Sequence, residues 1–364
     1  MTTAVPSAPP RTALSVRTAY GPSFELLAIT QAYLFRSHHA YYDLGRAWFA
    51  KLARSAPETF GQLRGFAGGS VMIWDHLYGI ALEVGGEHDI GSFIDRVEQM
   101  HAPELRLELL GRRYRNLQRT VGIELIEEAA AGSATAQRDF LRLAWPEDSP
   151  WQTGIRELLK DSPAQTQERL VNLLRVLERD LWQHIEPTLD ALAADAGEKR
   201  QAALVEDPLD VIRTAIDTAY SPSAEVNGVV LIPSFVIRPQ VYYFEFTDQM
   251  LFVYPLSDRH AESLGAGPSD RLVRLAAALG DRGRLRILAA LKERGMGLKE
   301  LGEELGVPRS TLRHHMGILY LAGLVRPMQT GTSGFNAYQL REEAATDLAE
   351  LVDKFLRGPT DKPS

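Results

Sequence analysis

The residues best suited to specific binding chemistry lie in one stretch near the end of the 364-residue chain. The 36 residues from Gly306 to Arg341 contain four arginines, two histidines and no carboxylate, although 47 of the 364 residues are Asp or Glu. A guanidinium can donate two hydrogen bonds to guanine O6 and N7, and it also binds phosphate. Because a carboxylate would repel phosphate, its exclusion from this stretch predicts a surface that approaches nucleic acid.

The distribution of charge along the chain agrees with this prediction. The formal net charge is −7, but residues 270–358 hold 14 Lys and Arg against 11 Asp and Glu, a balance of +3 that leaves −10 for the rest. A nucleic-acid partner is therefore expected for the C-terminal region alone. The basic run Arg112–Arg115 is interpreted as a solvated helix end, with contact to flanking DNA as the alternative.

A second group of candidate binding residues lies in the N-terminal part, which has the richest aromatic cluster. Pockets for small molecules combine apolar walls with a few polar anchors, so this cluster is a candidate effector pocket. We favour the alternative, a core with aromatic residues at its edge. The candidate pocket residues are His38, Tyr41, Tyr42, Trp74 and Tyr78.

The sequence lacks the motifs of several other protein classes. It has no phosphate-binding loop, no G-x-G-x-x-G, G-x-S-x-G or H-E-x-x-H motif, and no cysteine. No apolar run reaches the length of a membrane span, and residues 1–13 lack the basic and apolar regions of a signal peptide. We therefore expect a cytoplasmic protein that is not an enzyme and uses no cofactor or metal.

The elements around the acid-free stretch have the spacing of a helix-turn-helix with a wing. Residues 298–305 predict a short helix, Gly306 supplies a left-handed turn residue, and Pro308 begins a helix that runs to about Leu321. Gly302 is expected where the two helices come closest. The flanking elements are expected as helices at 270–279, 283–294 and 342–356, and as wing strands at 324–328 and 335–340.

The segments ALGDRGRLRILAALKE and LKELGEELGVPRSTLRHHMGILYLAGLV, with the wing after them, resemble the ArsR-type repressors. The resemblance covers residues 270–357 and implies a homodimer, joined through its first and last helices, that binds a palindromic operator. It also implies that the recognition helix 308–321 enters the major groove while the wing 325–341 contacts phosphate or the minor groove. The DNA-binding residues so implied are Arg309, Ser310, Thr311, Arg313, His314, Arg326, Gln329, Thr330 and Thr332.

The chain departs from this family at its metal sites. The metal sensors of the family use cysteine pairs on the recognition helix or carboxylate and histidine sets on the last helix. This chain has no cysteine and no histidine after His315, so no metal sensing is expected at those positions. His315 is expected to pack against the helical core. The long N-terminal region resembles that of longer ArsR-like regulators, through patterns such as GVVLIPSFV.

The expected fold class is mainly α with a small antiparallel sheet, an N-terminal helical domain followed by the winged helix. The domains are a disordered tail 1–13, a domain 14–259 for dimerisation or effector binding, a linker 260–269 and the DNA-binding domain 270–358. Leucine spacing predicts one long helix over 165–192, which Pro187 bends near its end. The runs 226–233, 241–247 and 249–255 predict an antiparallel meander, with a strand at Leu14 as a fourth member.

The sequence leaves three functions open. The one we adopt is a homodimeric transcription regulator, a repressor as in the family, with a small-molecule effector bound by the N-terminal domain. The second is an N-terminal enzyme or carrier with a regulatory winged helix. The third is a winged helix used for protein contact, which would be expected to lose the exposed arginines that this chain keeps.

Overall fold

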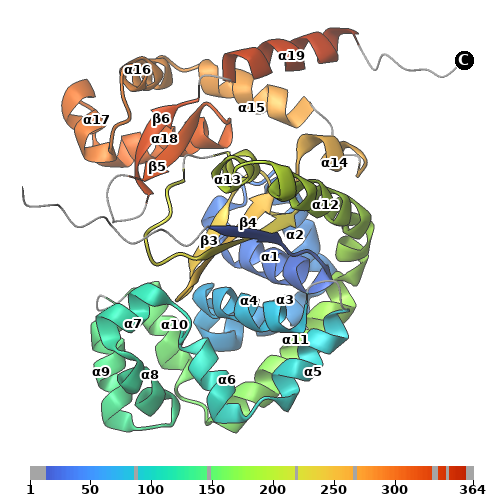
Figure 1. The fold of residues 1–364 in the computed structure, drawn as a ribbon, viewed down its shortest axis with the longest axis vertical. Helices are drawn as coiled ribbons and strands as arrows, with labels where there is room; N and C mark the ends of the chain where they lie inside the picture. The colour runs from blue at the N-terminus through green and yellow to red at the C-terminus, as the bar shows by residue number, and fades with distance from the viewer. Residues whose placement is uncertain are drawn as a thin grey trace, which may run out of the picture.

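Two units, each packed around its own apolar core, make up the chain (Figure 1). The computed structural model describes residues 14–85, 89–145, 149–217, 220–264, 269–329, 335–341 and 344–357. Helices predominate in both units, which confirms the mainly helical prediction. The predicted tail 1–13 and the wing residues Thr330 and Thr332 lie outside the described residues.

Proline and serine begin many helices of the N-terminal unit. Pro22, Pro57 and Pro163 occupy first-turn positions, where a missing N–H costs nothing, and Ser162 forms a capping box with Gln165. None of the described helices is long and apolar enough to cross a membrane. The helices are α1 Pro22–Leu34, α2 Gly45–Ser55, α3 Pro57–Gly65, α4 Met72–Val84, α5 Ile90–Gln99, α6 Ala102–Leu109, α7 Arg115–Val121, α8 Ile123–Ala130, α9 Ala134–Ala144, α10 Pro150–Leu158, α11 Pro163–Ile185, α12 Leu189–Val205, α13 Pro208–Ile216 and α14 Asp258–Glu262, with short 3₁₀ turns η1 Arg36–His38, η2 Phe66–Gly69 and η3 Glu186–Thr188.

The single long helix predicted over 165–192 is wrong beyond residue 185. Helix α11 ends at Ile185, the turn η3 contains Pro187, and α12 begins at Leu189. A proline lacks the N–H that would bond to the preceding turn, and its ring crowds that turn's carbonyl. The proline therefore breaks the helix, and the break leaves room for the cavity described below.

The N-terminal sheet is mixed, so the antiparallel meander predicted for it is wrong. Its strands are β1 Ser15–Thr18, β2 Gly228–Ser234, β3 Tyr242–Glu245 and β4 Gln249–Pro255, in the order β1-β2-β4-β3. Strands β1, β2 and β4 are parallel, and only β3 runs antiparallel to its neighbour β4. The prediction that the Leu14 region adds a fourth strand is confirmed by β1.

Burial on both faces explains this arrangement. Val230 and Ile232 of β2 pack into the core shared with α1 and α4, whereas Val229 and Leu231 pack with α13 on the opposite face. In Figure 1, α12 and α13 accordingly lie on one side of the sheet, and α1 and α4 lie on the other. Parallel sheets are normally covered in this way, and their strands read as continuous apolar runs rather than alternating ones.

The C-terminal unit contains α15 Ser269–Leu279, α16 Arg282–Leu291, α17 Leu298–Leu305, α18 Arg309–Leu321, β5 Val325–Gln329, β6 Phe335–Leu340 and α19 Ala344–Arg357. Each predicted helix and strand of this region is present. The predicted linker 260–269 starts too early, because α14 buries Ala261 against Leu192 and Leu256. Residues 258–262 therefore belong to the N-terminal unit.

Ion pairs join the two units. Arg274 of α15 lies 2.9 Å from Asp43, and Arg341 lies 2.9 Å from Asp217. A cavity of about 560 Å³ lies beside these pairs, lined by residues of both units that include Tyr320 at the end of α18. The contact is polar, as is common between domains that keep separate cores.

Candidate nucleic-acid interface

A tight turn sets the angle between α17 and α18. Gly306 has φ +65°, the left-handed conformation that favours glycine, and Val307 N donates to the Gly302 carbonyl over 3.2 Å. A Cβ atom at Gly302 would lie 3.3 Å from the Val307 carbonyl and 3.4 Å from Leu312 Cδ1. This close approach confirms the expectation that a small residue is needed where the helices cross.

Helix α18 is anchored on one side and exposed on the other. Leu312, Met316 and Leu319 are buried in the core of the C-terminal unit at a spacing that places them on one face. The predicted contact residues Arg309, Ser310, Thr311, Arg313 and His314 are all exposed.

The beginning of α18 is also suited to anions. Pro308 precedes its first turn, which contains no acidic residue, so the free N–H groups of this end face solvent without a competing carboxylate. Arg309 and Arg313 are four residues apart and therefore lie on the same side of the helix. Together they give this end of the helix a positive surface of the kind that phosphate and guanine edges bind.

His315 points away from this surface. Its side chain is 18% exposed, and its Nδ1 atom lies 4.0 Å from the Oδ1 atom of Asp281. The same carboxylate caps α16 by accepting a hydrogen bond from Arg284 N, which lowers the pKa of Asp281. The expectation that His315 packs inward is thus confirmed, and Asp281 serves as the N-cap of α16.

The wing is supported by a third extended segment that the sequence did not reveal. Met296 pairs with Tyr338 of β6 through two backbone hydrogen bonds of 2.8 and 2.9 Å. Strands β5 and β6 pair in antiparallel register, with Arg326 opposite Gln339. The wing therefore has three members at its base, and the signal that could have found the third is the apolar Met296 between two glycines.

Arg326 occupies a different environment from the arginines of α18. Its side chain is half-buried and lines the cavity between the two units, together with Arg341. Gln329 is the last residue of β5, and its side chain is not described. The structure therefore brings the five helix residues to one exposed surface and places Arg326 apart from them.

The residues of the candidate effector pocket lie in the main core or at its edge. Tyr42, Trp74 and Tyr78 are 3% exposed or less and belong to the main core. The Tyr42 hydroxyl lies 2.5 Å from that of Tyr242, and Tyr78 donates to Gln31 over 2.9 Å. His38 and Tyr41 lie at the edge of this core with their rings in edge contact. None of the five lines the cavities of about 560 and 410 Å³.

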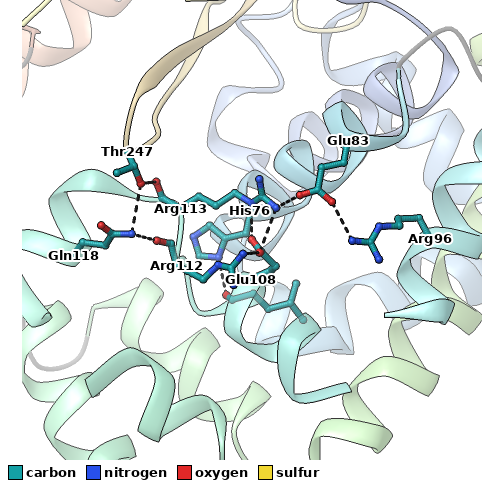
Figure 2. Close-up of polar contacts among 9 residues, drawn as sticks. His76, Glu83, Arg96, Glu108, Arg112, Arg113, Gln118 and Thr247 are labelled. Carbon is teal, nitrogen blue, oxygen red and sulfur yellow. Dashed lines mark hydrogen bonds and ion pairs between the residues drawn. The ribbon is translucent and has the colours of Figure 1, made fainter. Parts of the chain in front are cut away.

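The basic run Arg112–Arg115 is tied into the fold (Figure 2). Arg112 and Arg113 both pair with the buried Glu108, and Arg113 also pairs with Glu83. Arg115 donates to the carbonyls of Phe246 and Thr247 over 3.0 and 3.2 Å. These arginines join α6 and α7 to the β3–β4 turn, so the run is part of the fold rather than a solvated helix end.

His76, also drawn in Figure 2, makes the N-terminal unit sensitive to acid. It is 3% exposed, and its Nδ1 atom donates to the Leu109 carbonyl over 2.6 Å. Burial lowers the pKa of His76 to about 4, although the hydrogen bond to Leu109 acts in the opposite direction and raises the pKa. The unfolded chain takes up this proton near pH 6.5, so stability present above pH 6.5 is lost as the pH falls toward 4.

The variant His76→Asn is expected to lose this part of the acid sensitivity, because asparagine keeps an N–H donor and does not titrate. Between pH 7 and pH 5 the original protein should lose about 2 kcal/mol more unfolding free energy than the variant. Urea unfolding at the two pH values measures this difference directly. Equal losses in the two proteins would show that His76 is not the titrating group.

Comparison with known proteins agrees with the geometry of α17 and α18. A family model described as a helix-turn-helix domain matches residues 279–327. An uncharacterized HTH-type transcriptional regulator of Methanocaldococcus jannaschii is 34% identical over 86 residues, which are 23% of this chain and 94% of that protein. The HTH-type transcriptional regulator KmtR of Mycobacterium tuberculosis is 33% identical over 84 residues, 22% of this chain and 63% of that protein. No solved structure matches.

The helix-turn-helix and these relatives define a DNA-binding protein. The chain belongs to the HTH-type transcriptional regulators. The prediction of a helix-turn-helix regulator whose partner is DNA is confirmed at this level. Because the matches cover less than a quarter of the chain, they leave the role of the N-terminal unit to be inferred from its structure.

Proposed function

We propose that the protein is a cytoplasmic, homodimeric repressor of the ArsR type that binds a palindromic operator. The observation that carries this proposal is the exposed, acid-free face of α18, where Arg309 and Arg313 stand at the N-terminal end of the helix. In this proposal these arginines contact guanine edges, while Ser310 and Thr311 hold phosphates and the wing follows the adjacent backbone. In this proposal the N-terminal unit, which extends through α14, carries sensing, and the C-terminal unit carries DNA binding.

Exposed apolar side chains support the homodimer. Helices α15 and α19 lie side by side at the outer edge of the C-terminal unit (Figure 1), and Val273, Phe355 and Leu356 are exposed to 63%, 63% and 74%. Apolar side chains of this size cost free energy in water unless a partner covers them. A second copy joined through the same two helices would cover them, and its recognition helix would read a second half-site about one DNA turn away.

An effector would act by changing this dimer geometry. The two recognition helices bind one operator only when their separation matches the spacing of the half-sites. A ligand that binds more tightly to another arrangement of the N-terminal and C-terminal units therefore weakens DNA binding, and the size of the effect is set by the difference between its affinities for the two arrangements. The ion pairs Arg274–Asp43 and Arg341–Asp217 between the units are the contacts that such a rearrangement would change.

Selection from genomic DNA tests the proposal. The purified protein is incubated with fragments of its own genome at about 100 mM salt, where phosphate contacts still hold, and the retained DNA is sequenced. We expect enrichment of one palindromic site, and an affinity for it that falls steeply as salt is raised, because bound phosphates release counterions. Retention without sequence preference, or a salt-independent interaction, would instead favour a winged helix used as a scaffold or for protein contact.

A further inference from the structure

The break between α11 and α12 opens a cavity of about 410 Å³ in the N-terminal unit. Its walls come from α1, α2, the end of α11, the turn η3 and the segments that follow β2 and α14. The cavity lies on the side of the sheet that α1 covers, and its volume is within the range of sites for small molecules. Most of its wall is apolar, and Ile29, Leu44, Trp48, Phe235, Val236 and Leu264 form that part.

One buried carboxylate, that of Glu25, belongs to this wall. Glu25 is 1% exposed, and its Oε1 atom accepts hydrogen bonds from the N–H groups of Phe235 and Val236 over 3.1 and 3.0 Å. The hydroxyl of Ser234 lies close enough to the Glu25 carboxylate to lower its pKa as a weak donor, and the Oε2 atom has no other hydrogen-bond partner. A buried carboxylate oxygen that only a weak donor reaches still costs free energy, and a ligand that donates a strong hydrogen bond to it would recover part of that cost.

The other groups of the wall indicate the charge of that ligand. Among the described residues that line the cavity there is no lysine or arginine, so the wall itself offers no countercharge to an anionic ligand. The remaining titratable group is His184, whose pKa is lowered by burial and by Lys51, and it therefore does not compete as a cation at neutral pH. Trp48, beside His184, offers an aromatic face of the kind that attracts cations.

We infer that this cavity binds an apolar organic amine, whose ammonium group donates to Glu25 Oε2 while its apolar body contacts Trp48 and Phe235. Burial raises the pKa of Glu25 to about 7, and a bound cation would restore its ionised form. Ser263 and Leu264 follow α14 directly in the chain, and α15 of the DNA-binding unit begins at Ser269. The cavity is therefore close in the chain to the DNA-binding unit. Its role as the effector site that controls this unit is the part of the inference that rests on the proposed function.

Three compounds with one ring system and different head groups test the inference on the full-length protein. Calorimetric titration is done with 1-naphthylmethylamine, with the neutral 1-naphthalenemethanol and with the anionic 1-naphthoate. We expect the amine to bind at least about tenfold more tightly than the other two, because a charge-assisted hydrogen bond to a buried carboxylate exceeds a neutral one. Equal affinities for the three compounds, or no binding of the amine, would overturn the assignment.

Two variants and one control locate the binding. Glu25→Gln keeps an oxygen that accepts from Phe235 and Val236 but removes the charge, and it should lower amine affinity about tenfold without changing binding of the alcohol. Leu264→Trp enlarges a side chain of the cavity wall and should abolish binding of both compounds. Glu186→Gln, at an exposed carboxylate of η3, should change nothing. Unchanged amine affinity in Glu25→Gln or in Leu264→Trp would refute the site.

The effect of the amine on operator binding is measured separately. Weaker operator binding by the original protein, but not by Glu25→Gln, would support the site as the effector site of the proposed repressor. Amine binding without any effect on DNA would support the ligand assignment and overturn its regulatory role, so the two proposals fail in distinguishable ways.

Discussion

Replacing Arg309 and Arg313 together by alanine is expected to weaken operator binding by about 100-fold or more, since a bidentate contact to guanine contributes roughly 1–3 kcal/mol of discrimination. Both side chains are exposed on the anchored helix α18, so their removal leaves the core residues Leu312 and Met316 in place. In a homodimer the loss occurs at both half-sites, which makes the effect larger. Fluorescence anisotropy with the selected operator at one fixed salt concentration measures it.

A matched control is available on α9. Arg138 and Arg142 have the same four-residue spacing and are exposed, but they belong to the N-terminal unit. Their double replacement by alanine changes the net charge equally and should leave operator affinity within about twofold, because the lost charges are not at the interface. Operator binding that survives the loss of Arg309 and Arg313 would remove these residues from the interface.

The same titration with a scrambled duplex separates two roles of the arginines. Contacts to bases are lost only with the operator, whereas contacts to phosphate are lost equally with both DNAs. We expect a larger loss with the operator. An equal loss would reassign both arginines to the DNA backbone and leave the sequence reading to other residues of α18.

The helix-turn-helix could be predicted because its determinants are local. Gly302, Gly306 and Pro308 lie within seven residues, and each acts on backbone geometry that the neighbouring residues alone define. The sequence pattern therefore contained the helix ends, the turn and the buried face. The exposed position of Arg313 followed from the same periodicity.

The mixed sheet could not be predicted in the same way, because strand order depends on contacts between distant residues. Strand β1 pairs with β2 more than 200 residues away, and β4 rather than β3 becomes the neighbour of β2. The continuous apolar run of β2 indicated burial on both faces, which favours parallel neighbours, but the short spacing to the next run suggested hairpins.

The cavity at Glu25 depends on contacts of the same kind. Glu25 and its backbone donors Phe235 and Val236 are 210 and 211 residues apart in the chain. A lone glutamate in the first turn of α1 looks like an ordinary helix-start residue, where acids are favourable. The aromatic residues that the sequence singled out, such as Trp74 and Tyr78, instead fill the core, as their size makes favourable.

The variant Leu312→Ala is expected to destabilise the DNA-binding unit by about 2–5 kcal/mol while leaving the N-terminal unit unchanged. Leu312 is fully buried in the C-terminal core, where its Cδ1 atom packs against Gly302. That core shares no buried residue with the main N-terminal core. Among the described residues, the ion pairs Arg274–Asp43 and Arg341–Asp217 and a hydrogen bond between Tyr320 and the backbone of Val241 cross between the units. Polar contacts of this kind transmit little stability, so the two units should melt separately.

Differential scanning calorimetry should therefore show two transitions, of which Leu312→Ala lowers one. The matched variant Leu174→Ala removes an equally buried leucine of α11 from the N-terminal core and should lower the other. Operator affinity of Leu312→Ala should fall at temperatures where its DNA-binding unit is melted. At the same temperatures the operator affinity of Leu174→Ala should persist. A single transition that both variants shift together would mean that the chain folds as one cooperative unit, because the contacts between the units would then contribute as much as the cores themselves.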